Sequence, residues 1–263
     1  MIKLAAADMD GTLLDSSHAL PADTAKVILA LKEKGIRFAA ASGRQYHSVR
    51  KIFDSIDIGD DIIYMAENGG VIVDKGELIS CTPLSRRDIE MFMGILEKMP
   101  QVSILLSGVE SAYVKKDPSG SFGFDAALYC ARYEELSDLL TACDKDTIVK
   151  IAVHDPDAEN GCWKELAEYS GSFSVVLSNT HWVDIMAKGV DKGKGLESIG
   201  RIYDIAPHEM MCFGDYLNDL AMIKYAAESY AMENGHPDLK AAARHIAPSN
   251  DEYGVMQILK TLL

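Results

Sequence analysis

The sequence has no long apolar run, few cysteines and too few basic residues to balance its acids. No stretch reaches the roughly 18 apolar residues of a membrane-spanning helix, so we expect no membrane partner. Asp8 interrupts the only early apolar run, so we expect no secretory leader. The five cysteines are scattered and form no Cys-x-x-Cys pair, which argues against disulfides and a zinc site and favours a cytoplasmic location.

The shortage of basic residues also limits the partners. Lysine and arginine total 26 against 40 aspartates and glutamates, and the formal net charge is −14. A nucleic-acid partner requires a basic surface, so we expect none. The 263 residues, of which 48% are hydrophobic, can bury a core and suit one large domain or two.

The first apolar run ends in two acids. Residues 2–7 predict a short buried strand, and Asp8 and Asp10 follow at its carboxyl end. If the strand pleat continued, both carboxylates would share one face, and Gly11 would let the chain turn away. Open parallel sheets bind ligands at this end of their strands. One acid could then attack a substrate while the other transfers protons, and the alternative is an Asp-rich turn.

Alternating helices and strands follow this run. The expected elements are helices at residues 21–34 and 45–56, strands at residues 37–41 and 62–66, and a hairpin at residues 71–79. A succession of strand, helix and strand indicates a right-handed crossover between parallel strands. Ser42, just after the second strand, would therefore face the same crevice as Asp8.

Residues 84–187 have a different pattern. They predict one helix, then two alternating strands, then mixed helix and strand, which indicates an inserted α+β domain. Near its end we expect His181 and Trp182 to be packing residues. Residues 210–213 then predict a buried strand, and Gly-Asp-x-x-Asn-Asp follows at residues 214–219. Taken alone, that stretch could be a polar turn with a helix cap.

Together these stretches resemble a known family. Asp-x-Asp-Gly-Thr-Leu-Leu at residues 8–14 and Gly-Asp-x-x-Asn-Asp at residues 214–219 are similar to two motifs of the haloacid dehalogenase superfamily. The layout resembles its Cof-type branch, which consists of phosphatases of small phosphorylated metabolites. The resemblance implies an α/β fold, with a doubly wound Rossmann-like parallel-sheet core of residues 1–83 and 188–263. Residues 84–187 would form the inserted α+β cap, which sets substrate specificity.

The resemblance also implies an aspartyl-phosphate mechanism with Mg²⁺ as cofactor. Asp8 would be the nucleophile, and Asp10 would donate a proton to the leaving oxygen and later take one from water. Asp8 and Asp215 would ligate the metal by their side chains and Asp10 by its backbone carbonyl. Asp219 would stand behind these ligands without touching the metal. An all-oxygen donor set of this kind suits Mg²⁺.

Four other residues are implied as phosphate ligands: Ser42, Gly43, Lys192 and Asn218. Lys192 lies in the glycine-rich residues 189–195, which are not a phosphate-binding loop of the nucleotide-binding type, because Gly195 stands where a hydroxyl is required. By resemblance Lys192 would precede a helix that begins near Gly195. Arg44 and Asn68 are candidates for substrate choice.

Other functions share some of these features. A phosphomutase or phosphotransferase of the same superfamily would use the same residues, and the sequence hardly separates it from a hydrolase of sugar phosphates or similar phosphomonoesters. A non-catalytic phospho-ligand sensor would not need an acid–base residue such as Asp10. The Glu-Asn-Gly at residues 233–235 replaces the usual Gly-Asn-Ala of the Cof-type branch, which leaves the role of Asn234 open.

Overall fold

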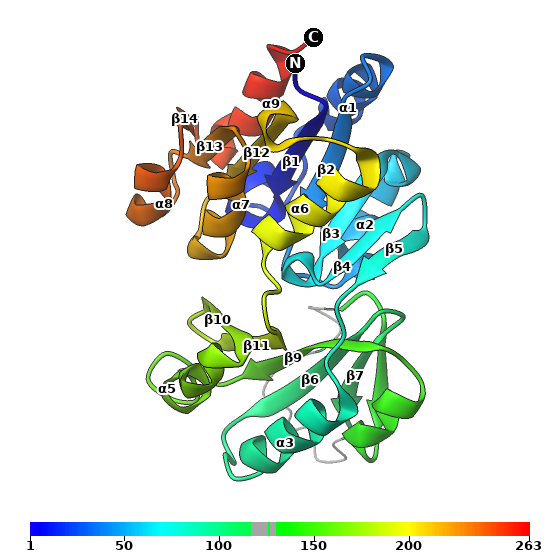
Figure 1. The fold of residues 1–263 in the computed structure, drawn as a ribbon, viewed down its shortest axis with the longest axis vertical. Helices are drawn as coiled ribbons and strands as arrows, with labels where there is room; N and C mark the ends of the chain where they lie inside the picture. Colours follow the sequence, from blue (N-terminus) through cyan, green and yellow to red (C-terminus); the bar gives the residue numbers. More distant parts are fainter. Residues whose placement is uncertain (117–125, 127–129) are drawn as a thin grey trace. The chain divides into compact units, whose positions relative to one another are not determined.

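The computed structural model describes residues 1–116, 126 and 130–263, and the chain divides into two compact units (Figure 1). The core unit comprises Met1–Ser80 and Asp191–Leu263, and the inserted unit comprises Cys81–Val190. The predicted insertion, residues 84–187, lies within the inserted unit. Among the described residues, no helix combines the length and apolarity needed to cross a membrane.

The core unit is built on one eight-stranded sheet with the order β14-β13-β12-β1-β2-β3-β4-β5. These strands are β1 (Leu4–Asp8), β2 (Arg37–Ala41), β3 (Ile62–Ala66), β4 (Val71–Asp74), β5 (Glu77–Cys81), β12 (Met210–Gly214), β13 (Glu228–Met232) and β14 (His245–Ala247). Neighbours are parallel from β14 to β3, and β4 is antiparallel to β3. The predicted strands at residues 37–41 and 62–66 have these exact bounds.

Helices cover both faces of this sheet. They are α1 (Thr24–Glu33), α2 (Tyr46–Asp54), α6 (Lys192–Tyr203), α7 (Leu220–Tyr225), α8 (Pro237–Ala242) and α9 (Gly254–Lys260). Helices α6, α7 and α8 pack on one face, against alternate residues such as Ala6 and Ala39. The sheet order runs one way from β1 to β3 and the other way from β12 to β14, so right-handed crossovers place α1 and α2 on the opposite face. The doubly wound α/β core is confirmed.

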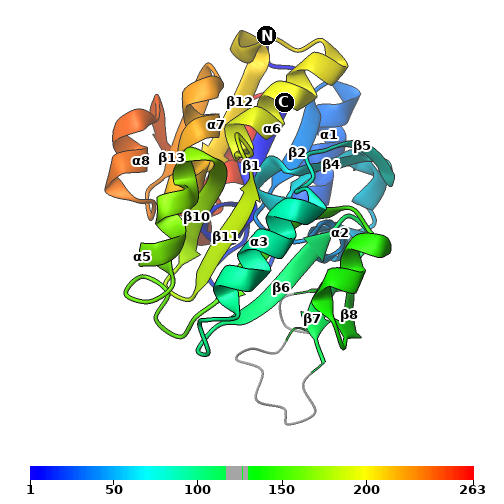
Figure 2. The same cartoon turned by 60° about the horizontal axis from the view of Figure 1, so that its bottom comes forward.

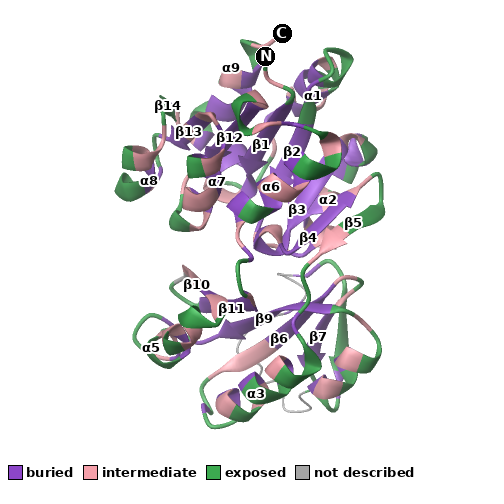
Figure 3. Cartoon of the chain, viewed as in Figure 1, coloured by how far each residue is buried: buried purple, intermediate pink, exposed green. Residues whose placement is uncertain are grey.

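The central strands owe their position to composition. In β1 and β2, six alanines are at most 1% exposed. Small apolar residues on both faces let helices approach from both sides, which is the usual condition of a parallel sheet. Figure 3 shows these strands as buried and the outward faces of the helices as exposed. The buried strands fix the loops at their carboxyl ends.

The inserted unit contains a six-stranded sheet with the order β10-β11-β9-β6-β7-β8. Its strands are β6 (Ser103–Gly108), β7 (Ala112–Lys115), β8 (Tyr133–Leu136), β9 (Ile148–His154), β10 (Phe173–Asn179) and β11 (Trp182–Ala187), and its helices are α3 (Arg86–Leu96) and α5 (Trp163–Leu166). Helix α3 lies across β6 (Figure 2), and its Phe92 packs with Leu106. The pairs are antiparallel except β7 with β8.

The two residues expected to pack near the end of the insertion behave differently. Trp182 is buried and its ring meets that of His154 edge to face, with centroids 5.0 Å apart. His181 is exposed, so the prediction was wrong for this residue. It lies in the tight turn between β10 and β11, outside the alternating pattern of either strand.

Candidate active site

The sequence-predicted residues meet at one edge of the core sheet. Asp8 ends β1, Ser42 and Gly43 follow β2, and Asp215 follows β12. The order places β12, β1 and β2 side by side and parallel, so their carboxyl ends lie together. This edge is where an open α/β sheet binds its ligand.

Three carboxylates form an acidic cluster there. One oxygen each of Asp8, Asp215 and Asp219 lies within 4.8 Å of the other two. Burial and the nearby charge of Asp219 raise the pKa of Asp8 well above its ordinary value. The same two causes raise the pKa of Asp215 to about 6, against a hydrogen bond from Thr12 Oγ1 at 3.0 Å. Carboxylates this close repel one another when they are ionised, so nearby positive charge is needed to stabilise their ionised forms.

Lys192 supplies part of that charge. Its Nζ donates to Asp8 Oδ1 at 2.5 Å and to Asp219 Oδ1 at 2.6 Å, and the side chain is fully buried. Burial alone would lower the pKa of this amine, but Asp219 and Asp8 outweigh it, so the pKa is raised. Lys192 is therefore a charged group beside Asp8.

The two oxygens of Asp219 are both committed to protein donors. Oδ1 accepts from Lys192, and Oδ2 accepts from the backbone N–H groups of Asp215 and Tyr216 at 2.9 and 3.2 Å. Asp8 accepts from Lys192 through Oδ1, Asp215 accepts from Thr12 through Oδ1, and the two carboxylates also hydrogen-bond to each other. The carboxylates of Asp8 and Asp215 are suitable ligands for a hard divalent cation. Asp219 is suited instead to hold Lys192 and the backbone of Asp215 in position.

Gly11 is required beside this cluster. It has φ +74°, and a Cβ placed on it would lie 2.5 Å from Asp215 Oδ2. A side chain would therefore strain the backbone and enter the space of the Asp215 carboxylate. The motif needs glycine for both reasons.

The strand pleat does not continue from Asp8 to Asp10, so the condition under which the two carboxylates would share one face is not met. Strand β1 ends at Asp8, and Met9–Leu13 forms a tight loop. The Asp10 carboxylate turns to Arg44, whose Nε donates to Oδ2 at 2.8 Å and whose Nη2 donates to Oδ1. Asp8 is buried, whereas the Asp10 side chain is 41% exposed. The two acids therefore occupy different environments.

The expected phosphate-binding residues are joined through Asn68. Ser42 is buried, and its Oγ accepts from the backbone N–H of Arg44 at 3.0 Å. A Cβ on Gly43 would lie 3.1 Å from Asn68 Oδ1, and the same oxygen accepts from Asn218 Nδ2 at 3.4 Å. Asn68, expected only as a candidate for substrate choice, thus links the loop after β2 to the loop after β12.

Helix α6 begins at Lys192 and not near Gly195, so the expected helix start was wrong. Asp191 caps the helix, because its Oδ1 accepts from Lys194 N at 2.7 Å. Gly195 lies within the helix, where its lack of a side chain lets α6 pack closely on β3, since a Cβ there would lie 2.3 Å from Met65 Sδ. The first turn of α6 thereby places Lys192 against Asp8.

Two asparagines support the loop that follows Asp8. Asn234 Nδ2 donates to the Gly11 carbonyl at 2.8 Å, and its Oδ1 accepts from Asn250 N at 3.1 Å. Asn250 Nδ2 donates to the Leu14 carbonyl at 3.0 Å. Sequence reasoning left the role of Asn234 open and assigned no site role to Asn250. Single asparagines carry no signal of contacts this distant in the chain.

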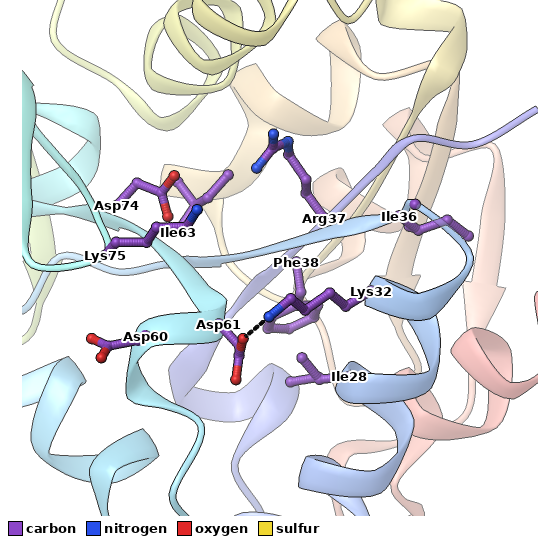
Figure 4. A pocket seen from close by; sticks show the side chains of 11 residues that line it. Ile28, Lys32, Ile36, Arg37, Phe38, Asp60, Asp61, Ile63, Asp74 and Lys75 are labelled. Carbon is purple, nitrogen blue, oxygen red and sulfur yellow. Dashed lines mark hydrogen bonds and ion pairs between the residues drawn. The ribbon is translucent and has the colours of Figure 1, made fainter.

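One cavity of the core unit lies away from this cluster. It measures about 310 Å³ and has Ile28, Phe38 and Ile63 at its apolar base, as Figure 4 shows. At its rim Lys32 is paired with Asp61. None of the predicted site residues lines it. The acidic cluster, and not this cavity, is therefore the candidate active site.

Comparison with known proteins agrees with this geometry. The family model of haloacid dehalogenase-like hydrolases matches residues 5–259. A 5-amino-6-(5-phospho-D-ribitylamino)uracil phosphatase of Escherichia coli, YbjI, is 31% identical, with 100% of this chain and 96% of that protein covered. Phosphatase YwpJ of Bacillus subtilis is 27% identical, with both chains covered fully. The crystal structure of SMU.1108c from Streptococcus mutans superposes with a TM-score of 0.88 at 29% identity, covering 100% of this chain and 99% of that one. The chain therefore belongs to the haloacid dehalogenase-like hydrolases and is a phosphatase of the Cof type.

Proposed function

We propose that this phosphatase hydrolyses small sugar or polyol phosphates with Mg²⁺, through a phosphorylated Asp8. The observation that carries the proposal is the separation of the two acids. Asp8 is buried against Lys192, and Asp10 is half-exposed and paired with Arg44. Two carboxylates in such different surroundings can take different roles, one as nucleophile and one as proton carrier.

The chemistry follows from these positions. An oxygen of Asp8 attacks phosphorus, the bond from phosphorus to the leaving oxygen breaks, and Asp10 gives that oxygen a proton. Water then attacks the phosphorus of phospho-Asp8 while Asp10 accepts a proton, which frees phosphate and restores both acids. Mg²⁺, held by Asp8, Asp215 and the carbonyl of Asp10, would supply positive charge at the phosphoryl group.

Four groups of the chain would bind the phosphoryl oxygens. The Ser42 hydroxyl, the Gly43 amide and Asn218 donate from neighbouring loops, and Lys192 adds a charge. Their positions are already fixed by the protein, which lowers the cost of organising them around the transition state. This arrangement would serve a phosphotransferase equally well, which is the second candidate function.

The substrate class is supported by the relatives. YbjI and two Bacillus subtilis proteins, YwtE and YcsE, are named as phosphatases of 5-amino-6-(5-phospho-D-ribitylamino)uracil, in which the phosphate is carried by a ribityl chain. We therefore propose a phosphate ester of a sugar or polyol as substrate. Residues 84–187, within the inserted unit, are proposed to act as the cap that selects it.

A panel of sugar, polyol, nucleotide and cofactor phosphates tests this function. We expect kcat/KM to be highest for sugar or polyol phosphates, and we expect ¹⁸O from labelled water in the released phosphate. Replacing residues 84–187 by a short Gly/Ser linker should keep cleavage of 4-nitrophenyl phosphate and remove discrimination among the natural esters, because remote binding energy is lost. Transfer of the phosphoryl group to a second sugar, with no ¹⁸O from water incorporated, would establish the phosphotransferase instead.

Metal binding should stabilise the protein more at pH 7 than at pH 5. The pKa of Asp215 is about 6 in the folded protein, above the ordinary value of 3.8. Between these two values the Asp215 carboxyl is protonated in the folded protein but ionised in the unfolded chain. Without metal, raising the pH from 3.8 to about 6 therefore lowers the free energy of unfolding, because the unfolded chain ionises more readily. Mg²⁺ favours the ionised carboxylates and offsets that loss. Thermal unfolding with Mg²⁺ or with EDTA at both pH values measures the effect, and an equal shift in Tm at pH 5 and pH 7 would contradict it.

A further inference from the structure

Arg44 connects two parts of the site. Its guanidinium donates two hydrogen bonds to the Asp10 carboxylate, from Nε to Oδ2 at 2.8 Å and from Nη2 to Oδ1. Its backbone N–H donates to Ser42 Oγ at 3.0 Å, and its carbonyl accepts from Glu67 N at 3.1 Å. The paired bonds have the fork geometry of an arginine–carboxylate contact. The Arg44 side chain therefore extends from a backbone whose N–H and carbonyl are both hydrogen-bonded.

The position of Asp10 makes such a contact necessary. Asp10 lies two residues beyond the end of β1, beside Gly11, and its side chain is 41% exposed. The second group near it, His18 Nδ1 at 3.3 Å, belongs to a side chain that is 69% exposed. A proton carrier must stay within about 2.6–3.2 Å of its target atom, and a misplacement of about 1 Å can cost 10²-fold in rate. An exposed loop carboxylate needs a fixed partner to meet this requirement.

We infer that Arg44 is a positioning residue that holds Asp10 in place for proton transfer and aims the Ser42 hydroxyl at the phosphoryl group. The inference rests on the proposed function. A protonated Asp10 still offers one oxygen to Arg44 while the other carries the proton, so the contact persists in both protonation states. The Arg44 N–H occupies a lone pair of Ser42 Oγ, which leaves the hydroxyl hydrogen free to donate to phosphate.

The test compares Arg44→Gln and Arg44→Lys on two kinds of substrate. With the best alkyl phosphate of the panel, whose alcohol must be protonated as it leaves, we expect Arg44→Gln to lower kcat/KM by about 10- to 100-fold. With 4-nitrophenyl phosphate, whose leaving group needs no proton, the loss should be much smaller. Arg44→Lys should recover only part of the rate, because an ammonium cannot form the fork. Equal losses on both substrates would overturn the inference.

A double-mutant cycle separates positioning from a merely structural role. If Arg44 acts through Asp10, adding Arg44→Gln to Asp10→Asn should cost little more in alkyl phosphate hydrolysis. Arg244→Gln is the matched control, because it removes an arginine that pairs with Glu228 at the amino ends of β13 and β14, away from the site. This variant should leave kcat/KM unchanged. Fully additive losses would overturn the inference. An Asp10→Asn variant with normal activity would instead contradict the proposed function itself.

Discussion

The Asp8→Asn variant should release no measurable phosphate, with kcat/KM at least about 10⁴-fold below that of the unchanged chain. Loss of a nucleophile commonly costs that much or more. The amide of asparagine is a poor nucleophile, and it cannot form the phosphorylated intermediate. The fold should survive, because asparagine has nearly the same shape and can still accept a hydrogen bond from Lys192 at this position.

Two measurements define the result for Asp8. Phosphate release gives the rate, and rapid acid quench followed by mass spectrometry detects the phosphorylated protein, which should appear with the unchanged chain alone. Asp60→Asn is the matched control, because its side chain is 73% exposed and lies near the amino end of β3. A folded Asp8→Asn variant with substantial turnover, or phosphate trapped on another residue, would show that the nucleophile is elsewhere.

Replacing Lys192 by methionine should both stop turnover and destabilise the core unit. The ammonium of Lys192 lies between Asp8 and Asp219, and it is fully buried. Removing one partner of a buried ion pair leaves an uncompensated charge, which typically costs about 3–5 kcal/mol. We expect a loss of this size in the free energy of unfolding, measured by urea denaturation in EDTA.

The chain offers two controls for Lys192. Lys194→Met removes a lysine of the same helix turn whose side chain is 65% exposed and paired with Glu197, and it should cost less than about 1 kcal/mol. Adding Asp219→Asn to Lys192→Met should restore part of the stability, since the buried charge is gone, without restoring turnover. Unchanged urea denaturation of Lys192→Met would contradict the role of this lysine as the buried counter-charge.

Much of the core could be predicted because its strands are buried on both faces. The apolar runs at residues 37–41 and 62–66 stop at polar residues, and these stops coincide with the ends of β2 and β3. Parallel order then places Asp8, Ser42 and Asp215 at one edge without any knowledge of side-chain positions. The fold and the gathering of the site follow from the same pattern.

The remaining details depend on contacts that the pattern does not encode. The direction of the Asp10 side chain could be predicted only if the strand pleat continued, and the tight loop after Asp8 ends the pleat. The contact between Asn234 and the Gly11 carbonyl joins positions 223 residues apart. The early start of α6 depends on the cap supplied by Asp191, which competes with the low helix propensity of the glycines that follow.

The order of the core sheet also has a consequence for synthesis on the ribosome. Strand β1 lies between β2 and β12, and Ala5 pairs with both Phe38 and Met211. When the first 80 residues emerge, one edge of this buried strand has no neighbour, and it stays open while the inserted unit, Cys81–Val190, is translated. The inserted unit is continuous in sequence and can fold in that interval. The acidic cluster closes last, because nascent chains lack Asp215 until the final strands of the sheet are being made.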